Sequence, residues 1–129
     1  MPFIRSVHHI AIICSDFVVS KHFYVDILGL EIIKEEYRED RDSFKLDLAL
    51  NGIYIVELFS FSDPPKRLSR PEGTGLRHLA FGVENVSFVI TEMNRHNIEV
   101  EPIRIDEGTG KEFTFIRDPD NLPIEFYQL

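Results

Sequence analysis

The chain has 129 residues, a net charge of −8 at pH 7 and a hydrophobic share of 43%. This length is expected to form one compact domain, 1–129, and the acidic balance argues against a nucleic-acid or anionic-membrane partner, because phosphate binding needs a basic surface. No apolar stretch approaches the length of a membrane span and no signal-peptide pattern is present, so the chain is expected to be cytoplasmic.

The first half of the chain predicts one strand, one helix and three further strands. Ser15 or Asp16 is placed to cap a helix over 17–28, where apolar residues recur at helical spacing. Asn51-Gly52 is typical of a tight hairpin between the last two strands. The predicted strands of this half are 7–14, 30–38, 43–50 and 53–61.

The second half predicts the same order of elements after a linker. Tandem prolines and late glycines exclude regular structure over 62–75, which is therefore predicted to be the linker. Asn85 is placed to cap the second helix and Asn97 to end it. A first strand that begins near Leu76 is followed by predicted strands over 98–105, 112–117 and 122–128.

The two halves match residue by residue, which indicates an internal repeat. His9 aligns with His78 at an offset of 69, and Glu57 aligns with Glu125 at an offset of 68. One half alone is too small to bury the apolar face of its sheet. We therefore expect an α+β fold in which two tandem βαβββ modules form a curved, cup-like mixed sheet with the helices outside. The predicted modules are 1–61 and 76–129.

Two histidines and two glutamates recur in the two modules, and their residue types suit a divalent metal ion. His9 and Glu57 are 48 residues apart, and His78 and Glu125 are 47 residues apart. The strand around each glutamate is apolar, where a lone carboxylate is unfavourable without a cation or a proton. A single buried histidine or glutamate is more often a structural group, but the repetition favours metal ligands. Two imidazoles and two carboxylates without thiolates suit a first-row divalent ion rather than a structural zinc site.

Three other histidines are predicted not to bind the ion. His8 faces away from the side of His9 by strand alternation and aligns with Arg77 in the repeat. It is interpreted as a residue that faces the helix or supports the ligands from behind. His22 and His96 lie on the predicted helices and are expected to be solvated.

The sequence around these positions resembles the vicinal oxygen chelate superfamily, in its glyoxalase I-like branch, over essentially the whole chain. The resemblance implies paired βαβββ modules that form a metal-bearing cup, usually completed in a homodimer. In dimeric relatives the first ligand pair often comes from one subunit and the second from the other. The motifs that carry the resemblance are His9-Ile-Ala with Asp16 downstream, Phe23-Tyr24-x-x-x-Leu28-Gly29-Leu30, Glu57-Leu58, Gly75-Leu-Arg-His78-Leu-Ala-Phe, and Asp118-Pro-Asp120 before Pro-Ile-Glu125-Phe.

The resemblance also implies a reaction, that of a carbon–sulfur lyase of the lactoylglutathione lyase type. The expected substrate is a small molecule, a 2-oxoaldehyde–thiol adduct or a related carbonyl compound, and the expected cofactor is Ni²⁺, Zn²⁺, Mn²⁺ or Fe²⁺. Glu125, or alternatively Glu57, is the expected base that takes the carbon-bound proton while the metal stabilises an enediolate. The ligands implied are His9, Glu57, His78 and Glu125.

Two positions depart from the glyoxalases that use glutathione. Those enzymes carry an arginine four residues after the first ligand histidine and tend to carry an asparagine four residues after the first ligand glutamate. Here the two positions are Ile13 and Phe61, which removes polar anchors for glutathione. Most cations that are candidates to replace them are expected to be mobile surface groups. These candidates are Arg5, Arg38, Arg41, Arg67, Arg70, Arg77 and Lys111.

Two other functions are alternatives at this level. Non-haem iron dioxygenases of the same superfamily typically use two histidines and one glutamate, so a carboxylate at Glu57 favours the lyase or isomerase. A non-catalytic protein that sequesters a ligand, as bleomycin-resistance relatives do, generally lacks the four ligands. Metal content and activity without O₂ distinguish the three.

Overall fold

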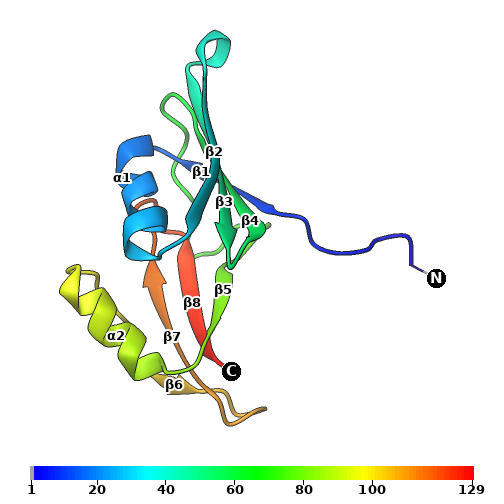
Figure 1. Ribbon diagram of the computed structural model, residues 1–129. Helices are drawn as coiled ribbons and strands as arrows, with labels where there is room; N and C mark the ends of the chain where they lie inside the picture. The colour runs from blue at the N-terminus through cyan, green and yellow to red at the C-terminus, as the bar shows by residue number, and fades with distance from the viewer. Residues whose placement is uncertain (1) are drawn as a thin grey trace. The chain divides into compact units, whose positions relative to one another are not determined.

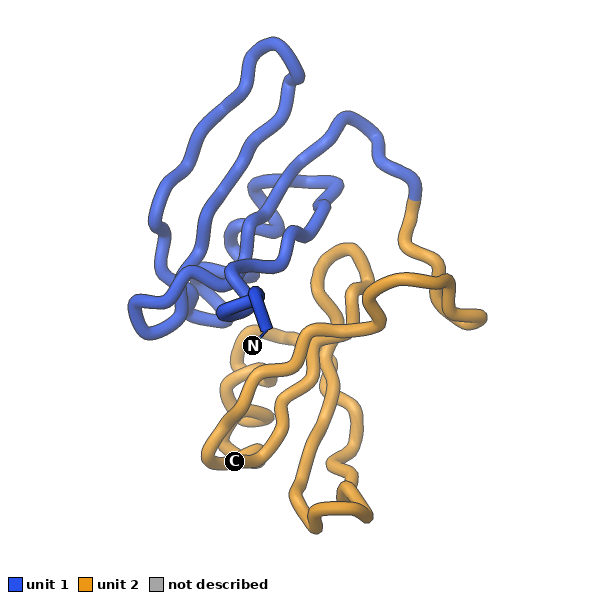
Figure 2. Tube along the Cα trace, turned by 90° about the vertical axis from the view of Figure 1, so that its right-hand side faces the viewer, with its two compact units in different colours: residues 1–65 blue, residues 66–129 orange. Residues whose placement is uncertain are grey.

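The chain folds into two compact units, Met1–Pro65 and Lys66–Leu129, which have different colours in Figure 2. The computed structural model describes residues 2–129. The boundary between the units falls within the predicted linker, 62–75, and no helix or strand forms over that stretch. Each unit has a strand, helical turns and three further strands in that order, which confirms the α+β class and the two βαβββ modules. The joining of the modules into one cup stays a prediction.

The first unit is built on a four-stranded mixed sheet with the strand order β1-β4-β3-β2 (Figure 1). β1 is parallel to β4, and the other neighbouring strands are antiparallel. The register between β3 and β4 shifts between Leu48 and Ala49, so that Ile55 is an extra residue in β4 and forms a β-bulge. The strands are β1 Ile10–Cys14, β2 Glu31–Arg38, β3 Ser43–Leu50 and β4 Ile53–Ser60.

The helix of the first unit begins after Asp16, whose side chain caps its first turn as predicted. The α-helix α1 extends only over Phe17–Lys21, and the chain continues as the π-helix η1, His22–Ile27. The prediction of one regular helix over 17–28 is therefore wrong in its second half. The hydrogen bonds there span five residues, as in Leu28 N–H to Phe23 C=O, and this widens the last turns.

The two faces of the first sheet differ in polarity. The helix covers an apolar face, where Phe17 of α1 stacks on Phe44 of β3 with ring centroids 4.3 Å apart. Because side chains alternate along a strand, the opposite face receives Lys45, Asp47 and Glu57. The fully buried residues of the helix-covered face are Leu46, Leu48, Val56 and Leu58.

The second unit repeats this plan with the strand order β5-β8-β7-β6, in which β5 is parallel to β8. The helix α2, Val86–Arg95, begins after Asn85, whose side-chain oxygen accepts a hydrogen bond from the Phe88 N–H at 2.9 Å. Over the part of the chain that is described, no helix is long and apolar enough to cross a membrane. The strands are β5 Leu79–Val83, β6 Arg104–Ile105, β7 Glu112–Arg117 and β8 Pro123–Gln128.

Three predicted strands are shorter than expected. β1 begins at Ile10 rather than at residue 7, so His9 lies in the extended segment just before the strand. β5 likewise begins at Leu79 rather than near Leu76. β6 is limited to Arg104–Ile105 instead of 98–105. Pro102 has no N–H to donate to a neighbouring strand, which explains why regular pairing does not extend through this segment.

Candidate metal centre

The first unit brings His9 and Glu57 together. Glu57 of β4 pairs with Ala11 of β1, and His9 lies two residues before Ala11, hence on the same side of the chain. Nε2 of His9 is 3.7 Å from Oε1 of Glu57. The side chain of Glu57 is 14% exposed and that of His9 is 34% exposed, so the pair is partly shielded but accessible to a small ion.

The second unit repeats the same pair with His78 and Glu125. Glu125 of β8 pairs with Ala80 of β5, again two residues after the histidine. Nε2 of His78 is 3.7 Å from Oε1 of Glu125, and the two side chains are 29% and 15% exposed. The distance and the burial therefore match those of the first pair closely. The repeated strand pairing explains the match, because it sets both positions in each unit.

The four predicted ligands thus occur as two pairs, one in each unit. Among residues 2–129 the structure contains no cluster of three or more such side chains. The donor atoms of each pair fit a divalent ion, since ligands about 2.1 Å from one ion are roughly 3.0–3.4 Å apart. A small rotation of either side chain closes the difference from 3.7 Å. The two donor atoms of each pair are therefore close enough to bind the same ion.

A polar cluster surrounds Glu57. The Tyr54 hydroxyl lies 2.9 Å from Oδ1 of Asp47 and 3.1 Å from Oε2 of Glu57, and Nζ of Lys45 is 3.4 Å from the same Oε2. Burial, together with the hydrogen bonds to the two carboxylates, raises the pKa of Tyr54 well above its usual range. Tyr54 is therefore a hydrogen-bond donor at physiological pH. The expectation that Glu57 lies in apolar surroundings is wrong, because Asp47 of β3 pairs directly with it.

The contacts of Glu57 with these three neighbours were not predicted from the sequence, although one signal for them was present. Lys45 and Asp47 alternate with apolar residues in the predicted strand 43–50, which marks one polar face of that strand. Tyr54 carries no comparable signal, because the residues around it in its strand, Ile53, Ile55 and Val56, are all apolar.

Glu125 has apolar surroundings, as predicted. Its partner across β7 and β8 is Phe115, which is 7% exposed. The Phe115 ring also meets the His78 ring edge-on, with centroids 5.2 Å apart and an interplanar angle of 90°. Within residues 2–129, no group donates a hydrogen bond to the Glu125 carboxylate. The second pair is thus held mainly by strand pairing and ring packing.

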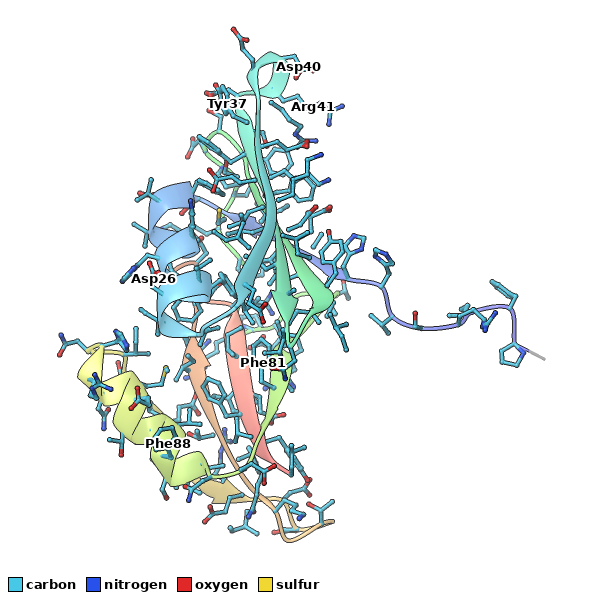
Figure 3. The ribbon with its side chains drawn as sticks, viewed as in Figure 1. Asp26, Tyr37, Asp40, Arg41, Phe81 and Phe88 are labelled. Carbon is cyan, nitrogen blue, oxygen red and sulfur yellow. The ribbon has the colours of Figure 1, made fainter. Side chains whose placement is uncertain are left out.

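The prediction that His8 lies on the opposite side from His9 is wrong. Its Nδ1 is 2.9 Å from Nδ1 of His9, and both rings contact the Tyr54 ring, so of the two predicted alternatives the contact beside His9 is the one that occurs. His22 is exposed, and its Nδ1 is 2.8 Å from Oδ2 of Asp26, which is labelled in Figure 3. His96 is also exposed at the end of α2.

The two positions that depart from the glutathione-using enzymes are exposed apolar side chains. Ile13 is 55% exposed and Phe61 is 41% exposed. Among the candidate cations, Arg67 donates to two backbone carbonyls, those of Leu76 and Arg77, and is therefore held by the fold. Arg38 lies over the Phe59 ring, with its guanidinium carbon 5.0 Å from the centroid.

The comparisons with known proteins agree with this architecture. Residues 6–126 match the family model of the Glyoxalase/Bleomycin resistance protein/Dioxygenase superfamily. The uncharacterized protein YwkD of Bacillus subtilis (strain 168) is 58% identical over 125 residues, which cover 97% of this chain and 98% of that protein. A glyoxalase family protein from Enterococcus faecalis is 44% identical with a TM-score of 0.91, covering 98% of this chain and 100% of the other.

A more distant structure shares the fold. It is the fosfomycin resistance protein FosX from Listeria monocytogenes, in complex with Mn(II) and a dihydroxypropylphosphonic acid. Its identity is 20% and its TM-score is 0.74, with 97% of this chain and 93% of the other covered.

Proposed function

Because the chain belongs to the glyoxalase/bleomycin resistance protein/dioxygenase superfamily, we propose that it is a metal-dependent, glyoxalase I-like lyase or isomerase. Its substrate is a 2-oxoaldehyde–thiol adduct or a related small α-hydroxy carbonyl compound. The observation that supports this most is the repeated His–Glu pair, with the same 3.7 Å between Nε2 and Oε1 in both units. Chance and fold stability alone give little reason for the same partly buried pair to recur.

The two pairs supply the four protein ligands of one divalent ion in this proposal. The donor set of two imidazoles and two carboxylates suits Ni²⁺, Zn²⁺, Mn²⁺ or Fe²⁺ and leaves positions for water or substrate. FosX, which has the same fold, binds Mn(II). The two pairs come either from one chain or from the two chains of a homodimer. We propose that the protein is cytoplasmic.

Glu125 is the proposed base. Its carboxylate accepts no hydrogen bond within the described residues and lies against Phe115, so it is freer to turn toward a substrate carbon than Glu57, which is held by Tyr54 and Lys45. A divalent ion, when bound, supplies Lewis acidity that stabilises negative charge on the two neighbouring substrate oxygens. Glu125 takes the carbon-bound proton and returns it to the adjacent carbon, so the product is an isomer of the adduct.

The thiol of the substrate is a separate question. Ile13 and Phe61 present apolar surface where glutathione-using enzymes carry polar anchors, so we propose that the thiol is not restricted to glutathione. The substrate therefore has to be found by assaying several thiols.

The experiment that tests the function is an anaerobic assay of methylglyoxal consumption with a panel of thiols and with each of the four metals. Turnover that depends on a metal and needs no O₂ is the expected result. Turnover only in the presence of O₂ would assign the chain to the dioxygenases instead. Metal binding without turnover of any adduct would contradict the proposed lyase and favour a ligand-binding protein.

A further inference from the structure

The two His–Glu pairs differ in what holds them, and the difference lies in Tyr54 and Lys45. At the positions of the second unit that pair in the same way, Phe115 replaces Asp47 and Phe113 replaces Lys45. The second unit nevertheless forms the same strand order and the same 3.7 Å pair. Because the fold and the pair do not require a polar cluster, the one in the first unit needs another explanation.

Tyr54 contacts both members of the first pair. Its ring stacks on the His9 ring, with centroids 5.0 Å apart and an interplanar angle of 7°. Its hydroxyl is 3.1 Å from Oε2 of Glu57. At the other ring nitrogen of His9, Nδ1 is 2.9 Å from Nδ1 of His8. One tyrosine side chain therefore fixes the plane of the imidazole and the rotation of the carboxylate together.

The contacts to Glu57 are divided between its two oxygens. Oε2 is occupied by the Tyr54 hydroxyl and by the Lys45 ammonium at 3.4 Å, whereas Oε1 points toward Nε2 of His9. An arrangement of this kind presents Glu57 as a ligand through one oxygen, Oε1, with the other oxygen held away from the ion. Partners of this kind commonly orient metal ligands, and their loss typically weakens metal binding about 10- to 100-fold.

Lys45 has a different effect from Tyr54, because it is charged. Its side chain is 28% exposed and lies within 4.0 Å of both Asp47 and Glu57. The ammonium balances the two carboxylates while no cation is bound. A divalent cation near Oε1 is repelled by this ammonium, so Lys45 opposes metal binding even as it holds the carboxylate.

We propose that Tyr54 is a positioning residue that presents His9 and Glu57 to the metal, and that Lys45 is a competing counter-ion that lowers the affinity of the same site. This inference rests on the proposed function, because it assumes that the first pair binds a metal. It assigns opposite effects to two side chains that touch the same carboxylate oxygen.

In the test, the metal-free protein is titrated with Co²⁺ alone. Calorimetry and the visible absorption of the bound ion measure the binding. The variants are Tyr54→Phe, which keeps the stacked ring and removes the hydroxyl, Lys45→Gln and Glu57→Gln. Tyr37→Phe is the matched control. Tyr37 lies at the outer end of β2 (Figure 3), and its hydroxyl donates to Asp42 at 2.6 Å, away from the His9–Glu57 pair.

We expect Tyr54→Phe to weaken Co²⁺ binding about tenfold and Lys45→Gln to strengthen it severalfold, the latter effect shrinking at high salt. Tyr37→Phe should leave the affinity unchanged. A residue with a merely structural role would change thermal stability but not the Co²⁺ affinity of the folded protein. If Tyr54→Phe does not fold, the Co²⁺ affinity of Lys45→Gln still tests the inference. Lys45→Gln should fold, since the substitution removes a charge from a partly exposed side chain.

The outcomes separate this inference from the proposed function. If the wild-type protein binds no Co²⁺, both are overturned. If it binds Co²⁺ and Glu57→Gln weakens the binding, but Tyr54→Phe leaves it unchanged or Lys45→Gln also weakens it, only the present inference is overturned.

Discussion

The two modules build the same His–Glu pair on sheets of the same strand order but surround it with different side chains. In the first module, Glu57 shares one oxygen with Tyr54 and Lys45. In the second, Glu125 lies against Phe115. Strand pairing sets the distance within each pair, whereas side chains of the same strand and of the neighbouring strand set how firmly the carboxylate is held. In the proposed function, the first module therefore holds its carboxylate in place on the metal, and the second module supplies the carboxylate that transfers the proton.

The largest expected effect is on catalysis, in the second module. Glu125→Gln should lower kcat about 1000-fold, because removing a general base typically costs 10²- to 10⁴-fold, while the similar shape of glutamine preserves the fold. Glu57→Gln should act mainly by weakening metal binding, so that added metal restores part of its activity. The measurements are kcat at saturating metal and the thermal midpoint of each metal-free variant. A full loss in Glu57→Gln that metal does not restore, with an active Glu125→Gln, would reverse the assignment.

The next largest effect concerns the cores of the two modules. Leu58 of β4 is 0% exposed and Ile116 of β7 is 1% exposed. Leu58→Ala and Ile116→Ala should each lower the free energy of unfolding by about 2–5 kcal/mol, through lost burial and the cavity left behind. Urea unfolding followed by circular dichroism measures the loss. A cost below about 1 kcal/mol for either variant would show that its module contributes little to the stability measured.

Helix capping should have a smaller effect. Asp16 accepts the Val19 N–H at 3.2 Å and Asn85 accepts the Phe88 N–H at 2.9 Å. Asp16→Ala and Asn85→Ala should each cost about 1 kcal/mol of unfolding free energy, because a first-turn amide loses its partner. Ser62→Ala, in the exposed linker, is the control and should cost less than about 0.5 kcal/mol. Equal stability of a cap variant and the control would mean that the cap bond is not formed in solution.

The smallest effect is a pH dependence confined to the second module. Hydrogen bonds from the Tyr127 hydroxyl and then from the Gly108 N–H lower the pKa of Asp106. A lowered pKa in the folded state adds stability that is present above the ordinary pKa of aspartate and is lost as the pH falls below it, through the folded-state pKa. The difference in thermal midpoint between wild type and Asp106→Asn should therefore shrink on acidification. A difference that stays constant down to low pH would argue against these bonds.

The sequence predicted the repeat, the order of the elements along each module and the matching histidine and glutamate positions, because these depend on local alternation and on matching positions. It did not predict the surroundings of Glu57. A two-residue hairpin at Asn51-Gly52 with regular pairing places Leu46 opposite Glu57, which agrees with an apolar environment. The shift between Leu48 and Ala49 places Asp47 there instead. A single-residue irregularity of pairing leaves no clear mark in composition or periodicity.

The π-helical turns of η1 and the short β6 escaped prediction for related reasons. Periodicity over 17–28 fits an α-helix and a π-helix nearly equally well over so few residues. The segment 98–105 alternates like a strand, and the effect of Pro102 on its pairing depends on the neighbour it meets.

The bulge at Ile55 decides which side chains of β4 lie on the same face of the sheet. In a regular strand, residues three positions apart face opposite sides, so Tyr54 and Glu57 would be on different faces. The extra residue between them brings both side chains to the same face, where they meet. Deleting Ile55 would make the strand regular and leave Tyr54 two positions before Glu57, still on the same face. Regular pairing of all four residues from Tyr54 to Glu57 would instead place the two side chains on opposite faces. The pairing of this strand, as much as the identity of its residues, therefore specifies the contact.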